Sequence, residues 1–448
     1  MLPEAVRAAI HGAADFVFGP WTLGLLLGTG FFLSVRLRFV QIGRFREAVR
    51  TLIPAGDRDA GGVLSPFQAF MTALAATIGT GNIAGVATAV VSGGPGAVFW
   101  IWCYGLFATA IKFSEAVLGI RFRVTEGGRV LSGPMYYLRD GLRSPVLAWL
   151  YALVAGIAAL TTTPFTQPNS MALVLNTQFA IPTWVSGVGI AVLTWLVVIG
   201  GITSIGRAAE RLTPLKVLLY LAGGSYVILA HISALPEVLA LIFREAFSIG
   251  AVGGGTAGVG VMVAMRYGLA RGIYANEAGY GTAAVAYGTA RSRAPLQQGL
   301  NAVMEVFIVS FVTSSISALT ILMSGVWRSG STSTAAVAEA FNTAIPVAGG
   351  WAVAICVFLF GYTTLIGWAY YGEQFLEYLL GVRVTMPYRW TYCGLIVLGA
   401  VSKVDTVWAW GDLMNGLQIF PNVIGLIGLS GLTAQVLRRP AAEGAASR

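Results

Sequence analysis

Charged side chains are scarce in this chain of 448 residues. Asp, Glu, Lys and Arg make up only 10% of the sequence, whereas a soluble globular protein carries about a quarter. Hydrophobic residues account for 56%, and the mean hydropathy is +0.75. The composition excludes a soluble chain and indicates a polytopic membrane protein with no room for a second, soluble domain.

Histidine and cysteine are also rare, with two His and three Cys residues. Cys103, Cys356 and Cys393 all lie in apolar runs, which is typical of packing thiols rather than of a disulfide framework. His11 and His231 stand apart from other candidate ligands, and no Cys or carboxylate grouping has metal-site spacing. These shortages argue against a membrane-embedded enzyme.

Long apolar runs dominate the remaining sequence. Each membrane-spanning helix needs about 20 apolar residues, so the chain has room for roughly ten to twelve spans. We therefore expect an all-α protein with eleven transmembrane helices. Their predicted ranges are 15–35, 66–90, 95–120, 146–176, 183–203, 213–231, 249–265, 298–325, 349–376, 390–402 and 412–436.

The basic residues predict the orientation of these spans. With the N-terminus outside, the inside segments hold 23 Lys and Arg residues and the outside segments hold four. The net charge of +9 then reflects topology rather than nucleic-acid binding. The N-terminal segment has no basic region or cleavage site typical of a signal peptide, so we expect it to be retained.

Glycines interrupt two of the predicted spans. Residues 79–82 read Gly-Thr-Gly-Asn, and residues 253–258 read Gly-Gly-Gly-Thr-Ala-Gly. After the first span, the other ten divide into segments 66–231 and 249–436, and each opens with one of these interruptions. Five spans is an odd number, so the two segments would be inverted repeats, a pattern typical of secondary transporters. Close helix packing is the alternative use of such glycines.

Six motifs follow one another along the chain, at 79–89, 93–102, 112–116, 133–137, 271–281 and 365–373. Together they resemble the signature of the alanine or glycine:cation symporter family, and the match covers roughly residues 60–435. The resemblance implies a LeuT-like core over 61–440, made of the 5+5 inverted repeats, preceded by an N-terminal peripheral helix and cytoplasmic linker over 1–60. It also implies cation-driven uptake of alanine, glycine and similar amino acids.

The interruption at 79–82 is the expected substrate site. Amides exposed at Thr80, Gly81 and Asn82, where the helix restarts, suit a substrate carboxylate. The resemblance places Gly81 at the carboxylate-binding position and a substrate-contacting glutamine at Gln167, for which a structural, helix-bridging role is the alternative. Further candidate contacts are Thr256, Thr363 and Trp368. Thr256 stands where the family often has Phe, so substrates somewhat larger than alanine are expected.

The resemblance also implies a sodium site at the same interruption. The carbonyls of Ala75 and Ile78 correspond to sodium ligands, and Thr363 and Thr364 form the adjacent hydroxyl pair that such a site needs. Taken without the resemblance, threonines in a helix more often bond to their own helix carbonyls. The sodium ion is the expected coupling ion.

One position departs from the family and leaves the proton as an alternative coupling ion. The family usually reads Val-Phe-Ile-Asp-Thr where this chain has Val309 and Ser310 after residues 306–308. Glu305 lies four residues before Val309 on the same helix face, so it is a candidate proton carrier. The spacing of Lys112 and Glu115 favours a structural ion pair.

We expect a symporter that takes up small neutral amino acids by alternating access, in the plasma (inner) membrane, with the C-terminus cytoplasmic. Its partners are the amino acid and the lipid bilayer, with no nucleic acid and no obligatory protein partner. A channel is the other class considered, but the sequence has no selectivity-filter repeat.

Overall fold

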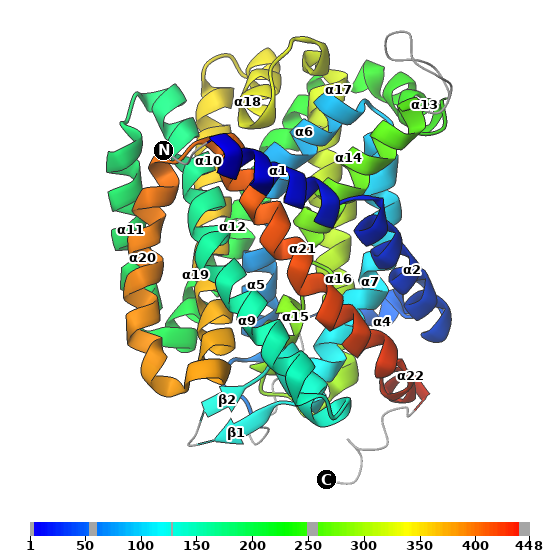
Figure 1. Ribbon diagram of the computed structural model, residues 1–448. Coiled ribbons are helices and arrows are strands. Elements are labelled where there is room, and N and C mark those ends of the chain that lie inside the picture. The colour runs from blue at the N-terminus through cyan, green and yellow to red at the C-terminus, as the bar shows by residue number, and fades with distance from the viewer. Residues whose placement is uncertain (1–3, 53–60, 127–128, 249–258, 439–448) are drawn as a thin grey trace.

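The computed structural model describes residues 4–52, 61–126, 129–248 and 259–438. The chain forms a helical bundle, with a two-stranded hairpin at one end (Figure 1). Before the predicted core come four helices. They are α1 (Glu4–Val17), α2 (Pro20–Arg36), α3 (Val40–Gly43) and α4 (Phe45–Arg50).

The next part of the chain contains the first interrupted helix, two strands and five long helices. Its elements are α5 (Pro66–Thr77), η1 (Thr80–Asn82), α6 (Ala84–Gly93), α7 (Ala97–Arg121), β1 (Val124–Glu126), β2 (Arg129–Leu131), α8 (Pro134–Tyr136), η2 (Tyr137–Gly141), α9 (Pro145–Thr161), α10 (Thr163–Phe179), α11 (Thr183–Val198) and α12 (Gly201–Ala230). The strands pair antiparallel, with Thr125 opposite Val130.

The described residues of the last part of the chain form helices joined by short loops. Its elements are η3 (Ile232–Ala234), α13 (Leu235–Ala246), α14 (Val259–Asn276), α15 (Thr282–Gly288), α16 (Pro295–Val306), η4 (Phe307–Thr313), α17 (Ser314–Met323), η5 (Val326–Arg328), α18 (Ser333–Ala344), α19 (Ala348–Leu380), η6 (Val382–Val384), α20 (Thr385–Val401), α21 (Val404–Gly428) and α22 (Ser430–Arg438).

The first predicted interruption is present in the structure. Helix α5 begins at a capping box, in which Gln68 N donates to Ser65 Oγ and Ser65 N donates to Gln68 Oε1, both at 3.1 Å. It ends at Thr77, and the chain turns through η1 before α6 begins at Ala84. The two helical parts are bent by 62° relative to each other.

The structure shows a second helix break at a place that the glycine run did not predict. Residues 253–258 lie outside the described residues, and α14 continues from Val259 to Asn276 without a break. The chain leaves the helix at Glu277 and resumes one at Thr282. Gly279 and Gly281 between them have φ values of 94° and 85°, a conformation that favours glycine. The first ten residues of the predicted span 249–265 lie outside the described residues, and its described part belongs to α14.

Several basic residues that the topology prediction assigned to inside loops lie in long helices, Arg207 and Arg211 of α12 among them. Lys216 is fully buried within α12, and Arg266 and Arg271 lie within α14. The Arg266 guanidinium pairs with Asp15 of α1 at 2.9 Å. The orientation of the helices stays a prediction.

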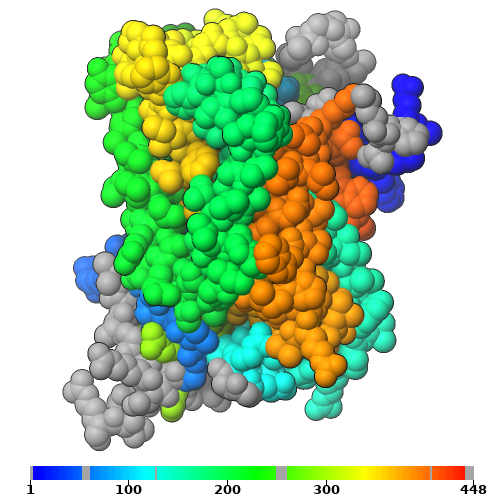
Figure 2. Space-filling view, turned by 90° about the vertical axis from the view of Figure 1, so that its left-hand side faces the viewer, coloured from blue at the N-terminus to red at the C-terminus, as the bar shows by residue number. Residues whose placement is uncertain are grey.

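The outward faces of the peripheral helices are apolar. Figure 2 shows the side of the molecule formed by α11, α12 and α20. Large exposed hydrophobic residues here include Trp184, Leu196, Leu218, Leu229, Trp390 and Leu398. Such a surface suits contact with lipid chains rather than water.

Within the described residues, six helical segments are long and apolar enough to cross a membrane. Counting each of two bent pairs as one span raises this number to eight. The chain is thus an all-α polytopic membrane protein, and the count of eleven spans stays a prediction.

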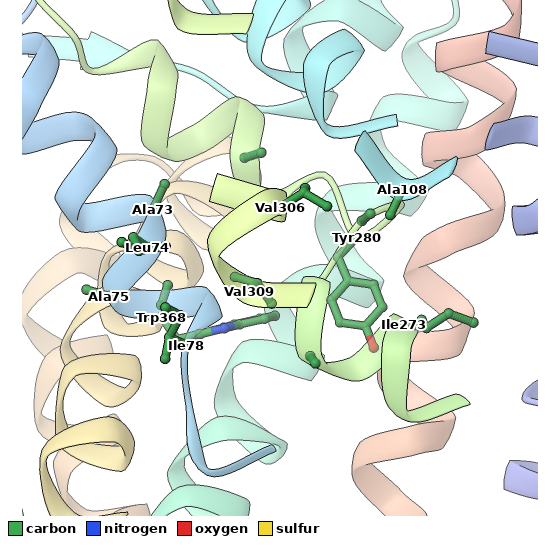
Figure 3. Packing of buried hydrophobic residues seen from close by; sticks show 14 of the residues in the cluster. Ala73, Leu74, Ala75, Ile78, Ala108, Ile273, Tyr280, Val306, Val309 and Trp368 are labelled. Atoms are coloured by element: carbon green, nitrogen blue, oxygen red, sulfur yellow. The ribbon is translucent and has the colours of Figure 1, made fainter. Parts of the chain in front are cut away.

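Small residues bring the central helices into close contact. A Cβ atom on Gly119 of α7 would lie 2.4 Å from Ala284 O of α15, and one on Gly268 of α14 would lie 2.4 Å from Ala97 O of α7. Figure 3 shows the neighbouring core, in which Ala73, Leu74 and Ala75 lie on α5. These contacts hold α7 directly against both parts of the second interrupted helix.

Candidate functional site

The first helix break frees backbone carbonyls at the end of α5, and side chains from elsewhere bind them. Thr364 Oγ1, on α19, lies 2.9 Å from Ala76 O and 3.2 Å from Ala75 O. The Asn82 side-chain amide donates to Thr77 O at 3.1 Å. Because lipid offers no hydrogen bonds, such side chains are needed to keep an unwound segment inside a membrane.

Lys216 of α12 binds the same break. Its Nζ donates to Ala75 O at 3.1 Å, to Ile78 O at 2.6 Å and to Thr363 Oγ1 at 2.5 Å. It also lies 5.2 Å from the centre of the Phe360 ring. Three of the four predicted sodium ligands therefore surround the amine of Lys216, and the fourth, Thr364, donates its hydroxyl to the α5 carbonyls.

Glu115 of α7 binds the second break. Its Oε1 accepts from Gly279 N at 2.9 Å, from Gly281 N at 3.1 Å and from Asn422 Nδ2 at 2.9 Å. The predicted ion pair between Glu115 and Lys112 is wrong, because each residue has another partner. The carboxylate instead accepts hydrogen bonds from backbone amides just before α15 begins. The positive end of the helix dipole at this place also stabilises a negative charge.

Lys112 pairs with Glu305 of α16, and both side chains are buried. The same carboxylate accepts from Thr77 Oγ1 at 2.6 Å and from the Tyr287 hydroxyl at 2.8 Å. Thr77 Oγ1 also accepts from Lys112 Nζ at 2.9 Å. The network joins the end of α5 to α7, α15 and α16, and it gives Glu305 a fixed ionic partner.

A small pocket lies between the two breaks. The residues that line it are Ala76, Thr77, Gly79, Gly81, Asn82, Thr163, Gln167, Tyr274, Glu277, Tyr280, Thr364, Trp368 and Asn415. They come from α5, η1, α10, α14, α19, α21 and the two breaks. The pocket thus combines backbone from both interruptions with amides, hydroxyls, aromatic rings and one carboxylate.

Five predicted substrate contacts lie in or beside this pocket. Gly81, Asn82, Gln167 and Trp368 line it. Gln167 Oε1 accepts from both Thr80 N at 3.1 Å and Thr80 Oγ1 at 3.0 Å, so Gln167 also bridges α10 to the break. Thr363 contacts Lys216 instead of lining the pocket. Thr256 lies outside the described residues.

Glu277 is a pocket residue that was not predicted from the sequence. Its Oε1 accepts from Trp368 Nε1 at 2.7 Å, and its Oε2 accepts from Thr282 Oγ1 at 3.0 Å. The side chain is buried, with 6% exposure. The sequence did offer a signal for this residue, namely a carboxylate between an apolar helix and two closely spaced glycines. Acidic residues within membranes are usually functional.

Tyr274, Tyr280, Thr163 and Asn415 are further lining residues that the sequence did not single out. Tyr274 explains the glycine at position 81, because a Cβ there would lie 2.7 Å from Tyr274 Cδ1. Val309, where the family usually has an acid, is fully buried in η4 among apolar residues, and Ser310 Oγ donates to Asn276 Oδ1 at 2.8 Å.

The whole chain matches a known protein family. The model of the sodium:alanine symporter family covers residues 3–444. The chain belongs to the sodium:alanine symporter family. This confirms the resemblance found in the sequence, and it makes the protein a transporter rather than an enzyme.

Relatives in this family align over most of their length. A sodium/alanine symporter of Methanococcus maripaludis is 38% identical over 433 residues, which cover 94% of each chain. A putative sodium/proton-dependent alanine carrier of Bacillus subtilis is 33% identical over 90% of this chain and 86% of its own.

The fold of this family member is similar to that of solved transporters. The crystal structure of MhsT in complex with L-phenylalanine superposes with a TM-score of 0.55 at 14% identity, covering 83% of this chain and 99% of MhsT. At that identity the likeness concerns the fold alone, which is the LeuT-like arrangement expected from the sequence.

Removing the Glu115 carboxylate should destabilise the second break. Glu115→Ala leaves two buried backbone N–H groups and one N–H of the Asn422 side chain without their acceptor, although Asn422 keeps its bond to Gly279 O, and each such group costs about 1–3 kcal/mol. We expect a clearly lower melting temperature of the purified protein in detergent. Glu115→Gln keeps one oxygen acceptor, so its melting temperature should lie between those of the wild type and Glu115→Ala. Glu126→Ala, at an exposed residue of β1, is the control. Equal melting of Glu115→Ala and the wild type would contradict the role of this carboxylate.

A methyl group at position 81 should disturb the pocket. Gly81→Ala places a Cβ 2.7 Å from the Tyr274 ring, whereas Gly28→Ala, on α2, meets nothing within 4 Å. We expect Gly81→Ala to lose at least about tenfold in amino acid affinity, because overpacking typically costs about 1–3 kcal/mol. Isothermal titration of both variants checks this expectation. Similar affinities would show that the Tyr274 side chain can move aside without weakening amino acid binding.

Proposed function

We propose that this protein takes up small neutral amino acids by secondary active transport, coupled to a cation gradient and working by alternating access. The observation that carries the proposal is the small pocket that both helix breaks line, with Gly81 and Asn82 from the first break and Glu277 from the second. Transporters with two broken helices bind their substrates at such a position near the bilayer midplane. Membership of the sodium:alanine symporter family supports the same class of substrate and ion.

The pocket can accommodate both charges of an amino acid zwitterion. In the η1 segment, where the chain restarts toward α6, the backbone amide of Gly81 suits a carboxylate, whereas the amides of Thr80 and Asn82 already donate to Gln167 Oε1 and Gly79 O. The carboxylate of Glu277 and the side-chain oxygen of Gln167 suit an ammonium group. Each charge would otherwise be costly to bury within a membrane.

The aromatic residues around the pocket favour a small side chain. Tyr274, Tyr280 and Trp368 all line it and are at least partly fixed by hydrogen bonds or packing. Alanine and glycine are therefore the first substrates to test. Thr256, from which larger substrates were expected, lies outside the described residues and does not enter this argument.

Sodium and the proton are the two candidate coupling ions. The description of the family supports sodium, and the printed name of the Bacillus subtilis relative includes both ions. Proton coupling through Glu305 is less favoured, because Lys112, Thr77 and Tyr287 all bind this carboxylate and it does not line the pocket.

We further propose eleven spans in the plasma membrane, arranged as one extra helix and two inverted repeats, 66–231 and 249–436, within the core at 61–440. The N-terminus lies outside and the C-terminus lies in the cytoplasm. The support is the excess of Lys and Arg in the segments assigned to the inside.

Cysteine labelling tests this orientation. In a variant without the three native cysteines, Ser329→Cys should react with a membrane-impermeant thiol reagent added to intact cells. Val382→Cys should react only after the membrane is opened. Both positions are exposed and they lie on either side of α19. The reverse pattern would overturn the orientation, and reaction of both positions on the same side would show that α19 does not cross the membrane.

Removing one hydrogen-bond donor tests the pocket itself. Trp368→Phe keeps an aromatic wall but takes the indole N–H away from Glu277. We expect uptake of alanine into proteoliposomes to require about a tenfold higher concentration, because a bond to a charged group is worth about 1.5–3 kcal/mol. Trp149→Phe, at a 55% exposed position of α9, is the matched control. An unchanged uptake profile would place the substrate elsewhere.

A further inference from the structure

Lys216 is one of three lysines in the chain and is fully buried in α12. Its Nζ has three oxygen acceptors, namely Ala75 O, Ile78 O and Thr363 Oγ1. The Thr363 hydroxyl donates its own hydrogen to Phe360 O at 3.1 Å, so toward Lys216 it acts as an acceptor. Three acceptors match the three hydrogens of an ammonium group, which is therefore the form that this geometry binds.

The ammonium group has no carboxylate partner among the described residues. None of the ion pairs found there involves Lys216. Its positive charge is instead compensated by two backbone carbonyls, one hydroxyl and the face of the Phe360 ring. Carbonyl and hydroxyl oxygens around a single positive charge are what a sodium site offers, and here a side chain supplies the charge.

We propose that the ammonium group of Lys216 takes the place of a sodium ion at the first helix break, so that amino acid binding does not require sodium at this position. The residues predicted as sodium ligands are present and close together, but they bind Nζ at 2.5–3.1 Å. A sodium ion would have to displace a covalently attached cation from the same oxygens.

The position of Lys216 makes it a positioning residue rather than a substrate contact. It does not line the pocket, whereas Thr364, next to its partner Thr363, does. Through its bonds to Ala75, Ile78 and Thr363, Lys216 links the end of α5 to α19 without lining the pocket. The unwound backbone that the substrate needs is thereby held in place by the protein itself, without the ion that would otherwise stabilise it.

The proposal depends on the proposed function only for the identity of the ligand. Purified wild-type protein is titrated with alanine at one pH and one ionic strength, in sodium chloride and in potassium chloride. We expect the two affinities to agree within about twofold. A wild-type affinity that falls about tenfold or more when potassium replaces sodium would overturn the proposal.

Lys216→Met provides the complementary test, because methionine has a similar length and no charge. In potassium chloride its affinity for alanine should be at least about tenfold weaker than that of the wild type. Sodium should restore much of this loss, since Ala75, Ile78 and Thr363 then offer their oxygens to a free ion. Lys403→Met, at an exposed lysine, is the control and should behave like the wild type in both salts. Wild-type affinity of Lys216→Met in potassium chloride would contradict the role of the ammonium group.

A readout without substrate separates this inference from the proposed function. Sodium should raise the melting temperature of Lys216→Met relative to potassium but leave that of the wild type unchanged. This pattern would support the inference even if alanine were not the substrate, and sodium stabilisation of the wild type alone would oppose it. If Lys216→Met does not fold, the comparison of wild-type affinities in the two salts decides the question.

Discussion

The structure depends on providing hydrogen-bond partners for the backbone groups of two interrupted helices in an environment without water. A carbonyl or amide left without a partner in a bilayer costs several kcal/mol, so each break needs its own set of donors or acceptors. The end of α5 has excess carbonyls and receives the ammonium group of Lys216. The start of α15 has excess amides and receives the carboxylate of Glu115.

These two charges have opposite signs because the two breaks expose opposite ends of the peptide dipole. Between them, the pair of Lys112 and Glu305 joins Thr77 at the end of α5 to α7 and α16. The pocket therefore lies in a framework of buried charges, each held by named partners. Such a framework favours one arrangement of the unwound segments, which is what selective binding of a small zwitterion requires.

The first break was predictable from sequence because glycine, threonine and asparagine occur together inside an apolar run. The juxtaposition of Ala75, Ile78, Thr363 and Thr364 was also anticipated, through the family resemblance. The break at Gly279 and Gly281 was not predicted, because the glycine run at 253–258, which lies outside the described residues, gives a stronger local signal, and the positive φ values of Gly279 and Gly281 become apparent only in three dimensions. Lys216 was assigned to a loop because it follows Arg207, Arg211 and Pro214, and no local pattern indicates that α12 begins at Gly201. The partners of Lys112 and Glu115 lie on other helices, which spacing along one helix cannot identify.

The attachment of a cation to α12 has an electrical consequence. A free sodium ion that travels with a neutral zwitterion adds one positive charge to the transported complex, and a membrane potential of 100 mV acts on that charge with about 2.3 kcal/mol. The ammonium group of Lys216 stays with the protein and is not released on the other side. A substrate carried past such a fixed charge crosses without that contribution, so this step of transport would draw less of its driving force from voltage and more from concentration differences.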